Sequence, residues 1–143
     1  MALQFLSPVH KATRQIGLYL TPKAEALGFG LPEAHLSSYL LAYGPCAIGE
    51  LHRVFGLRRS TLTSILDRLE ERGLLERSIH PDDRRSFLVE LTAAGRKMAA
   101  KTNRDVQVLE DAIRERLKPS DIKGFERVME AIAEATQVEV RQR

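Results

Sequence analysis

Two aspartates and two arginines follow one another at positions 82–85, directly after a proline, in the segment SIHPDDRRSFLVELT, residues 78–92. Such a cluster is compatible with a metal site, a catalytic group, a solvated turn or a contact surface for nucleic acid. His80 adds a nitrogen donor, but the spacing of these donors matches no recognised ligand set, and the adjacent arginines would repel a cation. The sequence therefore predicts no metal at this cluster.

Other catalytic constellations are missing from the sequence. It contains no glycine-rich phosphate loop, nucleophile elbow or zinc-protease helix, and Ser60 and Ser64 have no histidine near them in the chain. The single cysteine, Cys46, allows no intramolecular disulfide, and no Lys, Arg or His lies within five residues to activate its thiol. We expect no enzymatic activity and no cofactor, and we expect Cys46 to be an inert core residue.

Alternating apolar and polar residues flank the charged cluster on both sides. Residues 74–79 and 87–91 have the period of two that is typical of strands, and the proline and aspartates between them suit a turn. This pattern predicts a β-hairpin with the four charges at its tip.

Two helices are predicted before the hairpin. Residues 47–55 form a short helix that Gly56 ends, and residues 60–72 form an amphipathic helix that Gly73 ends. A helix, a short turn, a second helix and a hairpin are the order of a winged helix-turn-helix. In that motif the second helix lies in the DNA major groove and the hairpin reaches the neighbouring backbone or minor groove.

The outward face of the second helix carries small hydroxyl groups in its first two turns, which suit an approach to phosphate and base edges. With the leucines pointing inward, the outward residues are Ser60, Thr63, Ser64, Asp67 and Glu71, with Thr61 and Arg68 on a flank. An ordinary solvated helix face is the alternative.

Further helices are predicted on both sides of this unit. Thr21 followed by Pro22 is a helix start, and Pro32 opens a helix that runs to about residue 43. Thr92 caps a helix to about Leu117, and Ser120 caps the last helix. That last helix has a narrow apolar seam, formed by Ile122, Phe125, Met129, Ile132 and Thr136. The seam packs either inside the chain or against a second copy.

Bulk properties fit one domain of 143 residues with a weak preference for anionic partners, because the net charge is +3 and the pI about 9.2. Residues 47–91 carry eight basic and eight acidic side chains. Binding of nucleic acid there would depend on the placement of charge. The N-terminus lacks the order of a signal peptide, and no apolar run approaches the ~20 residues of a membrane span. We expect a cytoplasmic protein without membrane contact.

Residues 56–96, GLRRSTLTSILDRLEERGLLERSIHPDDRRSFLVELTAAGR, resemble the MarR family of bacterial transcription regulators. The shared pattern is Ser-Thr-x-Thr, DRLEERGLLER, Asp-Arg-Arg in the wing, and Leu-Thr-x-x-Gly. The resemblance implies a mostly α (α+β) fold, a winged helix-turn-helix with a two-stranded wing plus N- and C-terminal dimerisation helices. We expect a single domain over 1–143, with dimerisation helices in 1–30 and 92–143 and a DNA-binding lobe in 31–91.

The resemblance also implies an obligate homodimer on double-stranded DNA with a pseudo-palindromic operator, released by a small-molecule or oxidant signal. The expected DNA-binding residues are Arg58, Arg59, Ser60, Thr61, Thr63, Ser64, Arg68, Asp83, Arg84 and Arg85. A possible effector pocket comprises His10, Arg14, His35 and Tyr39, and the expected dimer interface comprises Leu6, Val9, Ile122, Phe125, Met129 and Ile132.

Two points in this assignment stay open. The family often has a serine-type cap at position 58, where this chain has Arg58, so either Ser60 caps the helix or Arg58 contacts phosphate. The predicted function is a transcription regulator, preferably a repressor. The alternative is a winged helix that binds another protein and no DNA, which the balanced charge of residues 47–91 supports.

Overall fold

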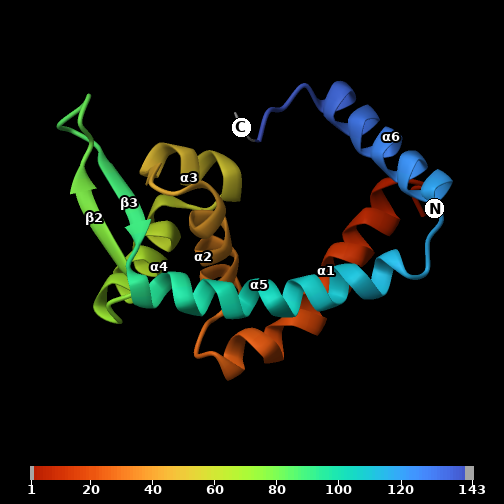
Figure 1. Ribbon diagram of the computed structural model, residues 1–143. Coiled ribbons are helices and arrows are strands. Elements are labelled where there is room, and N and C mark those ends of the chain that lie inside the picture. The colour runs from red at the N-terminus through yellow and green to blue at the C-terminus, as the bar shows by residue number, and fades with distance from the viewer. Residues whose placement is uncertain (1, 141–143) are drawn as a thin grey trace.

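Residues 2–140 of the computed structural model form six helices and three short strands (Figure 1). In chain order these are α1 (Leu6–Ala26), α2 (Leu31–Tyr43), β1 (Cys46–Ala47), α3 (Ile48–Phe55), α4 (Arg59–Glu71), β2 (Leu75–Ile79), β3 (Phe87–Leu91), α5 (Ala93–Arg114) and α6 (Pro119–Thr136). This architecture confirms the predicted winged helix-turn-helix with flanking helices.

One end of the molecule is a compact lobe of α2, α3, α4 and the sheet (Figure 1). Its core contains the inward residues that the helical and strand periods predict. Among the fully buried side chains are Leu36, Leu51, Leu62, Ile65, Leu66, Leu69, Leu75 and Val89. Burial of these apolar side chains fixes α4 with its hydroxyl-bearing face outward.

The sheet is antiparallel, with strand order β1-β3-β2. In the hairpin Leu75 pairs with Leu91 at the base, and Ile79 pairs with Phe87 near the tip. The third strand, β1, was not predicted because only two residues form it. Cys46 of β1 is fully buried opposite Val89, and its Sγ donates to the Tyr43 carbonyl at 3.3 Å.

The base of the hairpin is joined to α5 by the Leu-Thr-x-x-Gly segment. As predicted, Thr92 caps α5: its Oγ1 accepts from the Gly95 amide at 3.1 Å, and it donates to the Gly73 carbonyl at 2.6 Å. Gly95 packs so closely on the backbone of Leu74 that an added Cβ would lie 1.9 Å from the carbonyl oxygen. The glycine therefore lets α5 approach the end of α4.

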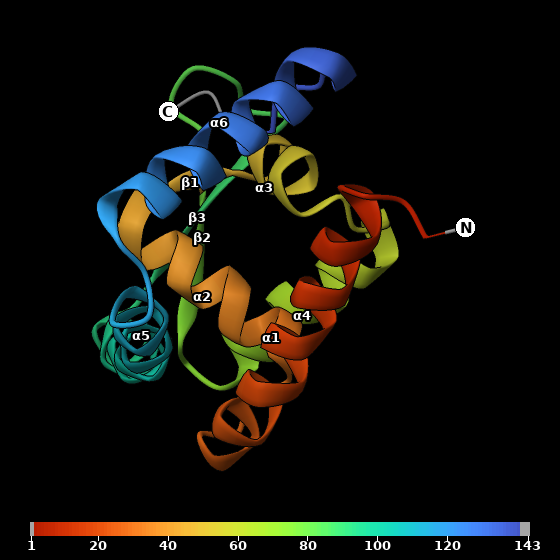
Figure 2. The same ribbon diagram turned by 90° about the vertical axis from the view of Figure 1, so that its right-hand side faces the viewer.

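The three long helices α1, α5 and α6 extend away from the lobe. α5 runs from the base of the wing along α2 and α1, and α6 lies at the far end beside the start of α1 (Figure 1). Figure 2 looks down the axis of α5, with α1 and α6 on the side facing the viewer. No residue of α6 is buried within this chain.

The predicted helix start at Thr21 is wrong, because α1 continues from Leu6 to Ala26 with Pro22 inside it. Thr21 does not cap a helix, and its Oγ1 donates instead to the Gly17 carbonyl at 2.7 Å. Leu20 and Ala24 are buried on either side of the proline. Their burial holds the helix together across the hydrogen bond that proline cannot make.

Three predicted helix ends also differ from the structure. Arg58 occupies the N-cap position of α4 with no side-chain cap, so of the two open alternatives the cap by Ser60 is wrong. α5 ends at Arg114, three residues before the predicted end. Lys118, rather than Ser120, is the N-cap residue of α6; Pro119 then begins the helix, and Asp121 accepts from the Lys118 amide at 3.0 Å.

Candidate nucleic-acid interface

The N-terminal half of α4 is an exposed polar surface. Its leucines and Ile65 are buried in the lobe, so Ser60, Thr63 and Ser64 face outward. Arg58 holds an extended conformation before the helix, and no side chain caps the first turn. The first amides of a helix carry partial positive charge and seek acceptors. An anion such as a phosphate can bind at this end of α4.

All ten residues predicted to contact DNA are exposed in this chain. They are Arg58, Arg59, Ser60, Thr61, Thr63, Ser64 and Arg68 on or beside α4, and Asp83, Arg84 and Arg85 at the wing tip. The fold thus brings two segments, separated by the second half of α4 and by β2, to the surface of the same lobe (Figure 1). Their contact with DNA stays a prediction.

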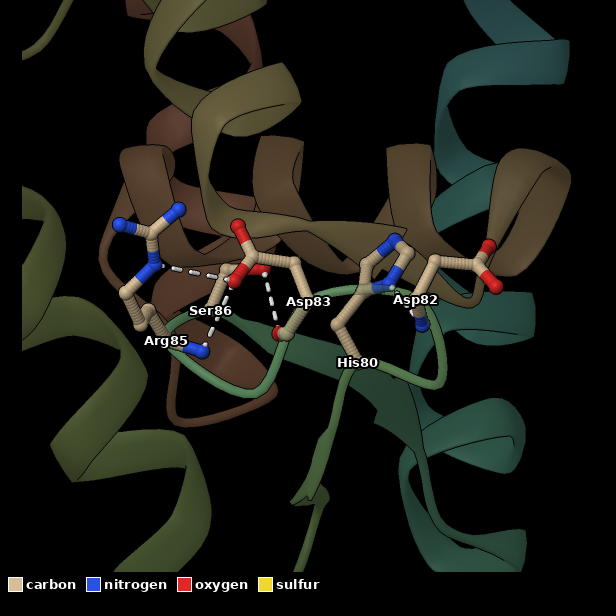
Figure 3. A network of polar contacts seen from close by, with 5 residues as sticks. All are labelled: His80, Asp82, Asp83, Arg85 and Ser86. Carbon is tan, nitrogen blue, oxygen red and sulfur yellow. Dashed lines mark hydrogen bonds and ion pairs between the residues drawn. The ribbon is translucent and has the colours of Figure 1, made fainter.

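The wing tip is organised by local hydrogen bonds (Figure 3). The Asp82 amide donates to Nδ1 of His80 at 3.1 Å, and the Ser86 amide donates to the Asp83 carbonyl at 3.1 Å. Asp83 Oδ1 accepts from the Arg85 amide at 3.0 Å and from Arg85 Nε at 3.4 Å. The cluster is thus a structured turn in which Asp83 orients Arg85, whose side chain is 93% exposed.

Arg77 connects the wing to α4, and the sequence reasoning gave it no role. Its guanidinium donates to Asp67 Oδ1, and its Nε lies 3.3 Å from Glu70 Oε2. Both carboxylates lie on the helix that would approach DNA, so Arg77 partly neutralises charge that would repel phosphate. The sequence does carry one sign of this role, because Arg77 lies between Leu75 and Ile79 on the otherwise apolar face of the strand.

A second contact, also missed from the sequence, fixes the other side of α4. Arg68 Nε donates to Glu33 Oε1 at 2.8 Å, which ties α4 to the first turn of α2. One turn later, Arg72 Nη1 donates to the Gly28 carbonyl at 2.7 Å, and its guanidinium lies over the Phe29 ring. Sequence periodicity gives no register between α4 and residues 28–33, so these pairs could not be predicted.

The four residues of the predicted effector pocket lie in different surroundings. His10 and Arg14 are exposed on α1, whereas Tyr39 is buried and its ring contacts those of Tyr43 and Phe55. His35 lines a small apolar cavity between α1, α2 and α5, whose lining does not include the other three. The cavity wall covers part of the His35 ring, which is otherwise exposed, and this desolvation lowers its pKa.

The predicted dimer residues lie along the far end of the molecule. Leu6 and Ile132 line an apolar groove between the start of α1 and α6, together with Phe5, Val128 and Ala131. Phe125 is 62% exposed, and Ile122 and Met129 are only partly covered. Much of the apolar surface of these side chains is therefore exposed to solvent in a single chain.

Neither a metal site nor a membrane span is found in the described part of the chain. Across residues 2–140, no group of His, Cys, Asp and Glu side chains is arranged to hold a metal ion. Over the same residues, every helix is too short or too polar to cross a bilayer.

The chain matches a protein-family model and curated bacterial proteins. The MarR family model matches residues 33–87. YwhA, an uncharacterized HTH-type transcriptional regulator of Bacillus subtilis, is 29% identical over 126 residues, which are 87% of this chain and 86% of YwhA. YcgE of the same organism is 32% identical over 80 residues, 56% of this chain and 52% of YcgE.

Solved structures share the whole fold at low sequence identity. A complex of MepR from S. aureus with DNA has a TM-score of 0.82 at 15% identity, covering 94% of this chain and 99% of MepR. NadR in complex with 4-hydroxyphenylacetate has a TM-score of 0.81 at 23% identity, covering 93% of this chain and 94% of NadR. A mutant MarR from E. coli with operator DNA has a TM-score of 0.73 at 22% identity, covering 87% of this chain and 89% of that chain.

Proposed function

Since the chain belongs to the MarR family of transcription regulators, we propose that it is a homodimeric repressor that binds a pseudo-palindromic DNA operator and is released by a small ligand. The observation that carries the proposal is the pairing of two exposed surfaces on one lobe. The hydroxyl-bearing face of α4 and the arginine-bearing wing tip are both held by side-chain contacts before any partner binds.

Each surface suits a different part of the duplex. α4 has the dimensions that a major groove accepts, and its serines, threonines and Arg68 supply donors and acceptors for base edges. Arg84 and Arg85 project from the hairpin and suit phosphate and the narrow minor groove. Charge placement thereby compensates for the balanced overall charge of residues 47–91.

Dimerisation is supported by the lack of cover over α6. Its apolar seam has no buried residue, and the groove beside Leu6 and Ile132 stays open within one chain. A second copy related by a two-fold axis would cover both seams at once and would present two lobes to DNA. Two half-sites should then lie about one helical turn, roughly 10 base pairs, apart.

An effector is part of the proposal because NadR, a protein of the same fold, binds 4-hydroxyphenylacetate. In this chain His10 and Arg14 lie on α1, and His35 and Tyr39 lie on α2. Of these four, His35 lines the small cavity between α1, α2 and α5, which is the candidate place for a ligand. A ligand bound there would change how the two lobes sit on the operator.

The test is selection of bound duplexes from a random pool, followed by a salt titration of the selected duplex against a scrambled one. We expect a two-fold symmetric consensus and an affinity that falls linearly with log salt concentration. Retention of no duplex at low salt would contradict DNA binding and favour a protein partner for the winged lobe. An asymmetric consensus bound with full affinity would contradict the dimer.

A further inference from the structure

Glu33 is a mostly buried carboxylate at the third position of α2. Its side chain is 12% exposed, and both of its oxygens have donors. Oε2 accepts from the Gly30 amide at 3.4 Å, and Oε1 accepts from Arg68 Nε at 2.8 Å. A carboxylate at this depth needs such compensation, and Arg68 supplies the positive charge.

Arg68 is held by one edge only. Its contact with Glu33 uses Nε, and within residues 2–140 no hydrogen bond or ion pair joins its two terminal nitrogens to another residue. The side chain is 56% exposed. The two terminal nitrogens form the planar fork that pairs with guanine O6 and N7. Glu33 thus holds the guanidinium of Arg68 through Nε and leaves its two terminal nitrogens available to pair with a base.

The position of Arg68 on α4 matches this geometry. Residues four apart are neighbours on a helix surface, so Ser60, Ser64 and Arg68 form one row, which ends with Arg68 on the flank of the outward face. Because the row is exposed throughout, a helix that enters a groove by its first two turns brings the third turn close to the groove edge.

We infer that Glu33 is a positioning residue for base recognition: it holds Arg68 in place to read a guanine edge in the major groove. This inference rests on the proposed DNA binding. An arginine that is already ordered loses less conformational entropy when it binds, so the correct base is favoured. The negative charge of Glu33 also offsets the attraction of Arg68 for phosphate, which every sequence offers equally. Glu33 therefore increases discrimination between sequences rather than general affinity.

The two effects give a signature that a purely structural role lacks. Loss of Glu33 should weaken binding to the selected duplex and leave binding to a scrambled duplex unchanged or slightly tighter. Loss of α2 stability, by contrast, would weaken both. Glu33→Ala removes the whole contact, and Glu33→Gln keeps an oxygen that can accept from the Gly30 amide.

Arg72→Ala is the matched control. It removes the contact of α4 with the Gly28 carbonyl and the Phe29 ring, one turn from Arg68, and leaves the Glu33 pair in place. It therefore loosens the same corner of the lobe without disturbing the guanidinium of Arg68.

The experiment is a double-mutant cycle of Glu33→Ala and Arg68→Ala in the full chain. Affinities for the selected and the scrambled duplex are measured by fluorescence anisotropy at one salt concentration, with Glu33→Gln and Arg72→Ala in parallel. We expect Arg68→Ala to lower the selected-to-scrambled ratio by roughly 5- to 150-fold, as for loss of a bidentate base contact. Glu33→Ala should lower it by roughly 3- to 10-fold, Glu33→Gln by less, and Arg72→Ala by less than twofold.

In the Arg68→Ala background, removal of Glu33 should have no further effect on the ratio. An equal effect of Glu33→Ala in both backgrounds, an unchanged ratio in Glu33→Ala, or an equal loss in Arg72→Ala would overturn the inference and leave the proposed function standing. If the parent prefers no duplex over another, the proposed function fails, and the inference fails with it.

Discussion

The guanidinium of Arg77, on strand β2, binds the carboxylate of Asp67, on helix α4, and so joins the wing to the helix that we propose enters the major groove. The same guanidinium also pairs with Glu70, one turn further along α4. Together with the contact between Glu33 and Arg68 on the opposite side, this pair fixes α4 between α2 and the hairpin. Side-chain contacts thus tie α4 to both of its neighbours in the lobe.

Arg77→Met should weaken binding to selected and scrambled duplexes alike. Two carboxylates on α4 would lose their partner beside the phosphates, and the wing would lose its tie to the helix. We expect the affinity for DNA, measured by fluorescence anisotropy, to fall roughly tenfold, which corresponds to about 1.4 kcal/mol. The exposed Arg104 of α5 supplies the control, Arg104→Met. Equal affinities of the two variants would show that the contact has no part in binding.

Arg85→Ala should reduce the salt dependence of DNA binding as well as the affinity. Loss of one phosphate contact lowers the log–log salt slope by about one unit, for every duplex sequence. Asp83→Ala should have a smaller effect in the same direction, because Asp83 only holds the amide and Nε of Arg85. Salt titrations of both variants provide the test. An unchanged slope in Arg85→Ala would mean that the wing tip is a solvated turn.

Ile132→Asp should dissociate the dimer. The substitution puts a carboxylate into the apolar groove formed with Phe5 and Leu6, where the second copy would leave it without water. Lys123→Asp puts the same group nine residues earlier, on the opposite face of α6, and should remain dimeric. Sedimentation velocity at micromolar concentration distinguishes the two. A monomeric parent would exclude the dimer at the outset.

Gly95→Ala should lower the free energy of unfolding by about 1–3 kcal/mol, the cost typical of overpacking. The new methyl would lie 1.9 Å from the Leu74 carbonyl oxygen, so α5 must shift away from the end of α4. Gly49→Ala is the control, because outside its own helix backbone and chain neighbours no atom lies within 4 Å of a Cβ there. Urea unfolding of both variants checks the difference. Equal stability would show that the junction relaxes freely.

His35 should make the protein less stable as the pH falls below about 6.5. Burial lowers the pKa of His35 from its usual value of 6.5 in the folded chain. Between the lowered value and 6.5 the unfolded chain binds more protons, so stability rises with pH across that window. Lys23 and Asp105 line the same cavity. Denaturant unfolding of the parent and His35→Gln at pH 5.5 and 7.5 should show a smaller pH effect in the variant. Equal pH effects would contradict this role.

Local patterns in the sequence determined most of the architecture. The period of Leu62, Ile65, Leu66 and Leu69 identified α4 and its buried face, because apolar side chains at helical spacing must be removed from water together. The alternation around Val89 identified the hairpin for the same reason. Both signals lie within a few residues, where backbone geometry alone dictates which side chains share a face.

Tertiary structure decided what local patterns cannot encode. Pro22 is a strong helix-start signal, yet burial of Leu20 and Ala24 carries α1 through it. Strand β1 exists only because Cys46 pairs with Val89, which lies 43 residues away in the chain. The contacts of Arg68 with Glu33 and of Arg77 with Asp67 join segments whose relative register no periodicity specifies. They form because packing of the shared core brings the charges within reach, and that packing is a property of the whole lobe.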